Sequence, residues 1–144
     1  MTRAGAVARI DALLGTVSDP TFKAIYFGEP ISIPATPMCA FWLQSHDADF
    51  ETLGDVSTTA TMLIRAYFPV LLNGDLRETV EQDVWDAIVK IKTALRGDAN
   101  LNGEVTDSEI GSATTGFIEL QGNLFRHATI PFEIDIYSEY PITP

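Results

Sequence analysis

A strongly amphipathic helix predicted over residues 76–95 constrains the fold of this chain more than any other feature. Trp85 widens an apolar stripe with helical spacing, whose other members are Val80, Val84, Ile88, Ile91 and Leu95. Asp75, with Glu78 three residues later, gives a capping-box-like start, and Gly97 gives a typical end. A helix with one apolar face of this kind requires a second layer of structure to cover that face.

The segments around this helix have the composition or the alternation of strands. Every second residue is apolar over residues 59–68, which predicts a strand with one buried face. Residues 127–137 alternate in the same way, and Pro131 predicts either an edge strand or a strand whose amide side is free there. The remaining predicted strands are residues 21–27, 38–44 and 115–121, and a short helix is predicted over residues 4–14.

These elements predict one domain over residues 1–144 with the order α-β-β-β-α-β-β. We expect an α+β fold, in which two flanking helices cover a mainly antiparallel sheet. A chain of this length buries about two-thirds of its unfolded surface without disulfides or metals. The apolar share of 46% is ordinary for such a core.

The charge balance narrows the partners. The chain carries 20 acidic and 9 basic residues, a net charge of −11. This balance disfavours a nucleic-acid-binding face and binding to an anionic membrane, because both need basic residues. It is compatible with an acidic wall past which DNA slides without sticking, and also with a simple solubility device. Cys39, the single cysteine, lies in an apolar run and predicts a buried thiol, and with no leader or membrane-length segment we expect an aqueous, reducing setting.

The sequence contains no recognisable catalytic constellation. His46 has Asp47 and Asp49 beside it, which fits either a metal site or a hydrated hairpin tip. His127 follows Arg126 at the start of a strand and is predicted to be a surface residue. No serine has a glycine elbow, and the glycines never cluster into a phosphate-binding loop. We therefore expect a protein that is not an enzyme, with no catalytic residues and no cofactor.

The loop after the long helix fits the calcium-binding EF-hand formula. The ligand offsets hold Asp98, Asn100, Asn102, Glu104, Thr106 and Glu109, with Gly103 at the sharp turn. The entering helix is present, but residues 110–116 are a poor helical run, and no second loop pairs with this one. We predict a solvated loop without a resident metal, and a calcium-dependent binding module on residues 98–109 is the alternative.

The layout as a whole resembles the lambda-type phage tail terminator family, also called minor tail or tail completion proteins. An N-terminal helix leads into the strand at residues 22–27, and Gly28-Glu29-Pro30 and a proline-bearing connector follow. A strand pair with an acidic tip then precedes the long helix. The segment 100–105 resembles the family's turn out of that helix, and two closing strands end near Pro141.

This resemblance implies a structural protein of the virion, assembled in the host cytoplasm and located at the head-proximal end of the tail. Such proteins form a ring, usually of six subunits, that caps the tail tube and ends its polymerisation. The other face of the ring meets the head–tail connector protein, and DNA passes through without specific binding. Another neck or connector completion subunit is the alternative within the same machinery.

Two polar loops are the predicted grips for the tube and connector proteins because of their length and polarity. They are residues 45–55 and 97–115. The residues expected to carry this role are His46, Asp47, Asp49, Glu51, Asp55, Asn100, Asn102, Glu104 and Asp107. A ring also needs exposed strand edges that neighbouring subunits cover.

Overall fold

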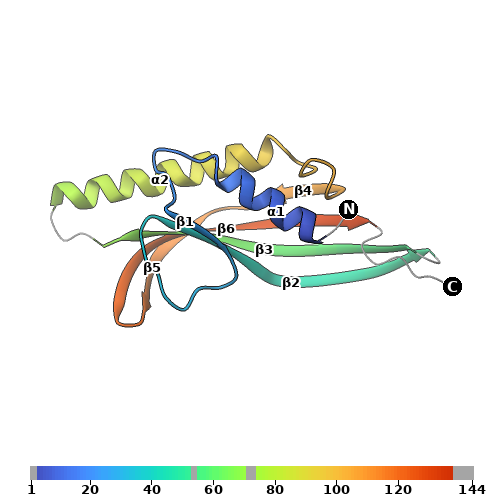
Figure 1. Ribbon diagram of the computed structural model, residues 1–144, viewed down its shortest axis with the longest axis horizontal. Coiled ribbons are helices and arrows are strands. Elements are labelled where there is room, and N and C mark those ends of the chain that lie inside the picture. The colour runs from blue at the N-terminus through green and yellow to red at the C-terminus, as the bar shows by residue number, and fades with distance from the viewer. Residues whose placement is uncertain (1–2, 53–54, 71–73, 138–144) are drawn as a thin grey trace.

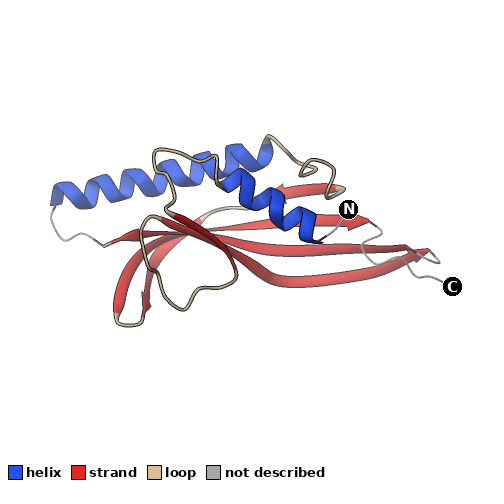
Figure 2. Ribbon diagram, in the orientation of Figure 1, coloured by secondary structure: helices blue, strands red, loops and turns tan. Residues whose placement is uncertain are grey.

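The computed structural model describes residues 3–52, 55–70 and 74–137 and is an α+β fold (Figures 1 and 2). Its elements are α1 (Arg3–Leu14), β1 (Ala24–Phe27), β2 (Met38–Thr52), β3 (Asp55–Pro69), α2 (Gly74–Arg96), β4 (Asp107–Ile110), β5 (Thr114–Leu120) and β6 (Asn123–Tyr137). The α+β class and a mostly antiparallel sheet are confirmed. Within these residues, neither helix combines the length and apolar character needed to cross a bilayer.

The six strands form one sheet in the order β1-β2-β3-β6-β4, and β5 also pairs with β6. Two features differ from the predicted order α-β-β-β-α-β-β. β4 is an additional strand inside the segment predicted to be a loop, and β1 is shorter than predicted and runs parallel to β2, so the sheet is mixed. β2 lies between β1 and β3 in this sheet, and the residues at its start are apolar on both faces.

Both helices lie on the same face of the sheet and share one buried core with it (Figure 2). The α2 stripe is confirmed at Val80, Val84, Ile91 and Leu95, which are at most 7% exposed. The assignment of Trp85 to this stripe is wrong, because its side chain is 73% exposed. The sheet covers the other flank of the stripe, where Ala87 is fully buried.

The prediction that the segment 45–55 is a polar tip is wrong for residues 45–52 and for Asp55, which belong to strands β2 and β3; residues 53 and 54 lie outside the described residues. β2 and β3 are each 15 residues long and form an extended hairpin that reaches the far end of the molecule (Figure 1). Pairing continues from Ser45 with Thr61 out to Thr52 with Asp55. Backbone hydrogen bonds between the two arms keep this polar segment extended, although its side chains have little strand preference.

β6 is the central strand of the second half of the sheet. Its alternating residues Ile130, Phe132, Ile134 and Ile136 are buried, as predicted. Gly111 N donates to Pro131 O, and in a strand the nitrogen and oxygen of one residue point to the same side. The nitrogen of Pro131 therefore faces the interruption between β4 and β5, where no strand needs a donor. The predicted free amide side is confirmed. Thr129, which lies on the opposite face of β6 from Ile130 and Phe132, is also buried. The turn into β6 is Gln121-Gly122, with both residues at positive φ.

Part of the opposite face of the sheet is also covered. Met38, Ala40 and Tyr67 form a smaller buried cluster there, packed against residues of the 28–37 connector and of the curled β5–β6 hairpin. Cys39 belongs to the main core, where burial raises the pKa of its thiol far above the usual value. The predicted buried thiol is confirmed.

Candidate functional site

One face of the sheet, the helix-free face, carries neither α1 nor α2, and the curled β5–β6 hairpin covers part of it. The uncovered part of this face is acidic. The residues on it alternate with Ala60 and Ile134, which point into the helix-side core. Strand register aligns two rows across β2, β3, β6 and β4. They are Asp47, Thr59, Asp135 and Asp107, and then Ser45, Thr61, Glu133 and Glu109. These rows hold five carboxylates and no lysine or arginine, and we call this surface the acidic face.

The acidic face contains like charges directly opposite one another. Asp107 pairs with Asp135 in register, and Glu109 pairs with Glu133. Such cross-strand pairs destabilise a sheet, so this arrangement works against stability. Thr59 Oγ1 donates to Asp135 Oδ1 at 2.9 Å and offsets part of that cost. The resulting negative potential repels phosphate groups.

The second feature is an open strand edge. β1 pairs with β2 only as far as Phe41, where Gly28 N donates to Phe41 O at 2.8 Å. Beyond Phe41, no strand in the described part of the chain pairs with β2 on this side. Beside this edge lies an apolar pocket of about 170 Å³, which we call the edge slot. It is lined by Arg3 and Val7 of α1, Phe27 of β1 and Leu43 of β2, over a floor of buried sheet residues.

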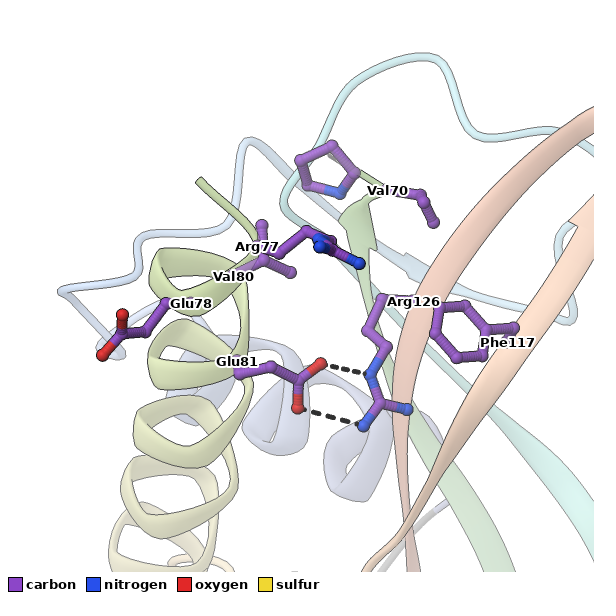
Figure 3. Close-up of a pocket in the computed structure, with 8 residues that line it drawn as sticks. Val70, Arg77, Glu78, Val80, Glu81, Phe117 and Arg126 are labelled. Carbon is purple, nitrogen blue, oxygen red and sulfur yellow. Dashed lines mark hydrogen bonds and ion pairs between the residues drawn. The ribbon is translucent and has the colours of Figure 1, made fainter. Parts of the chain in front are cut away.

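A larger pocket lies at the N-terminal end of α2, between the helix and the β5–β6 hairpin (Figure 3). Arg126 forms its wall. Its guanidinium donates to both carboxylate oxygens of Glu81, at 2.7 and 3.2 Å, and to Gly116 O at 2.9 Å, and it lies 5.0 Å from the centre of the Phe117 ring. These contacts tie α2 to β5 and β6, and the hydrogen bond from Arg126 lowers the pKa of Glu81. Arg77 points into the same pocket.

A cluster of polar side chains lies on the helix-free face of the sheet, beneath the β5–β6 hairpin. Arg65 Nε donates to Thr129 Oγ1 at 2.7 Å, and the same hydroxyl lies 3.1 Å from Nδ1 of His127. The guanidinium of Arg65 also lies over the Trp42 ring, 5.3 Å from its centre. His127 is therefore half-buried and not simply a surface residue. Burial, and then the charges of Arg65 and Arg126, lower its pKa.

The EF-hand-like loop is organised as a turn that enters a strand. Arg9 Nε donates to Asp98 Oδ2 at 2.6 Å, and Asn102 N donates to Asp98 Oδ1 at 3.0 Å. Glu109 lies in β4, where a calcium loop would start its exiting helix. Within the described residues, no three His, Cys, Asp or Glu side chains are arranged to hold a metal ion.

The residues predicted to grip partners occupy four different settings. His46, Asp47, Asp49 and Glu51 lie in β2, Asp55 in β3, Asn100, Asn102 and Glu104 in the turn after α2, and Asp107 in β4. The side chains of Asp49, Glu51 and Asp55 are outside the described part of the structure. Of this set, the structure brings together Asp47 and Asp107 on the acidic face, and it places His46 beside the edge slot.

Sequence reasoning missed Glu133 and Asp135, the members of the acidic face that come from β6, and it named Glu109 of β4 only as a ligand of the calcium-like loop. The signal was present as acidic residues two positions apart, at Asp107 and Glu109 and at Glu133 and Asp135. That spacing places each pair on one face of a strand. The strand at residues 107–110 was not predicted. The sequence therefore offered no reason to place Asp107 and Glu109 beside Asp135 and Glu133.

A comparison of the chain with models of known protein families finds no match, and a comparison with curated protein sequences finds none either.

Proposed function

We propose that this protein is a ring-forming structural component of a phage tail, of the tail terminator type. In this role a ring of about six copies caps the completed tail tube, stops further addition of tube protein and joins the tail to the head connector. The proposal combines the layout of the sequence with the surfaces described above.

The observation that carries the proposal is the acidic face. A ring through which a genome passes needs a lining that does not hold DNA. Five carboxylates without a basic residue on an exposed sheet surface meet that need, because phosphates are repelled from them. The like-charge pairs Asp107–Asp135 and Glu109–Glu133 cost stability, which is consistent with a role outside folding.

The strand edges support the ring itself. An open edge such as that of β2 is a surface that a neighbouring chain covers by strand pairing. β4 and β5 pair with β6 at the opposite edge of the same sheet, with β3 between β6 and β2. Among the described residues, the two edges of the sheet that a neighbouring chain could cover are therefore different. Two unlike surfaces favour a head-to-tail contact, and head-to-tail contacts close into rings when the rotation permits.

The ring is tested by light scattering of the purified chain in EDTA, then magnesium, then calcium, with electron microscopy of the heaviest species. We expect a mass about six times the 15.7 kDa of one chain, and annular particles, in at least one buffer or on tail tube ends. Assembly with calcium but not magnesium would instead support the calcium module at residues 98–109. A chain that remains monomeric in every buffer and on tube ends would overturn the ring.

The tail role is tested by the length of tail tubes. Tail tube protein polymerised with this chain should give tubes that stop growing and carry a cap at one end. A neck or connector subunit would form rings and leave tube growth unchanged. In the phage that encodes the chain, loss of the gene should leave filled heads and unjoined tubes of uncontrolled length, and normal virions would contradict the proposal.

A further inference from the structure

The edge slot has the two features that strand addition requires. Beyond Phe41, no strand among the described residues pairs with the outer side of β2, and the slot beside it takes an apolar side chain. Phe27 and Leu43 at its rim are 49% and 48% exposed, a large apolar area for a strand edge. The slot lies on the helix side of the sheet, so an added strand would point its helix-side residues into it.

β5 offers matching residues on its helix side. It pairs with β6 on one side only, within the described residues. Phe117 lies beside the N-terminal end of α2; Arg126 packs against its ring, which is nevertheless 61% exposed. Glu119, the next residue on the same side of the strand, is also exposed.

Charge decides among three strands of a second copy that could add to this edge, namely β4, β2 and β5. With the helix layers aligned, addition of β4 would place Asp107 and Glu109 on the same side as Asp47 of β2, which is repulsive. Pairing of β2 with β2 of the second copy would place the Asp47 carboxylates of both copies on the same joined edge, which is also repulsive. Addition of β5 places Glu119 near Arg3, the cation at the slot.

We propose that β5 of a second copy of this chain adds to the open edge of β2, with Phe117 in the edge slot and Glu119 facing Arg3. This inference rests on the ring proposed above and identifies the two surfaces that meet in it. Because the surfaces differ, each copy uses both, and the contact propagates around the ring.

Cross-linking tests the contact directly. In the double variant Leu43→Cys/Phe117→Cys, a short bismaleimide should link successive copies into a ladder of covalent multimers. Each single variant should remain unlinked, because a head-to-tail contact brings together one residue of each kind. The native Cys39 is fully buried and does not compete. Covalent dimers of Leu43→Cys alone would show β2–β2 pairing and overturn the proposal.

Charge exchange gives an independent readout. Arg3→Glu and Glu119→Arg should each weaken self-association by about tenfold or more, because each places like charges in contact. The double variant should restore it. Asp86→Arg, at an exposed position of α2, changes the net charge by as much as Glu119→Arg and should leave the ring intact.

The outcomes separate this contact from the tail role. Rings seen by microscopy without a cross-linked ladder and without charge rescue would overturn the β5–β2 contact and leave the terminator proposal standing. A ladder and charge rescue, in a protein that does not cap tubes, would establish the contact and reject the tail role.

Discussion

Thr58 and Thr59 are adjacent in β3 and have hydroxyls in opposite environments. Thr58 is fully buried, and no hydrogen-bond partner for its Oγ1 exists among the described residues, whereas Thr59 donates to Asp135. Replacing Thr58 with valine should raise the free energy of unfolding by about 1 kcal/mol, because an unsatisfied polar group is removed. Thr59→Val, the matched control, should lower it. Urea denaturation of both variants measures the difference, and equal signs would contradict this account.

The Arg9–Asp98 ion pair makes stability depend on pH. The hydrogen bond from Arg9, and then that from the Asn102 amide, lower the pKa of Asp98 below its ordinary value near 3.8. The stabilisation is therefore complete above the unfolded-state pKa and is lost as the pH falls through the lower folded-state pKa.

The stability difference between wild type and Asp98→Asn should therefore narrow as the pH is lowered from about 6 to about 3. Comparing the two proteins at each pH removes the effect of the other carboxylates. In an Arg9→Ala background the difference should be smaller and flatter, because the main cause of the shift is absent. A difference that stays constant with pH in the wild-type background would show that the ion pair does not carry the effect.

At the scale of elements, β4 is held to β6 in spite of its charges. Glu109→Lys, opposite Glu133, should raise the free energy of unfolding by about 0.2–1 kcal/mol, because a like-charge pair becomes an opposite-charge pair. Glu119→Lys on β5 makes the same charge change opposite Leu124 and serves as the control. Chemical denaturation of the monomers compares them. A larger gain in the control would contradict cross-strand repulsion as the cause.

Over the whole molecule, the net charge of −11 opposes assembly. In the proposed ring, copies would repel one another over distances set by the Debye length, which falls from about 30 Å at 0.01 M salt to about 10 Å at 0.1 M. Self-association, followed by sedimentation velocity, should therefore strengthen as sodium chloride is raised over this range. Association that weakens steadily with salt would indicate an interface dominated by ion pairs, and not by the apolar slot and backbone pairing.

The sequence-based predictions that the structure confirms have local physical causes. The α2 stripe and the buried faces of β3 and β6 follow from side-chain periodicity, which is fixed by the backbone geometry of each element. The free amide side at Pro131 follows from the absent donor of proline. The prediction that Trp85 is buried was wrong because helical periodicity locates the centre of an apolar stripe but not its margins. The sheet covers the margin that holds Ala87 and leaves the margin that holds Trp85 exposed.

The sequence by itself determined the α+β class, the long helix, the buried faces and the acidic balance of this protein. The tertiary structure decided the parallel pairing of β1, the existence of β4, the long β2–β3 hairpin and the gathering of distant carboxylates into the acidic face. Each of these depends on hydrogen bonds between segments far apart in the chain, and periodicity within one segment contains no information about its partner. Polar residues 45–52 therefore read as a loop, and only pairing with β3 makes them a strand.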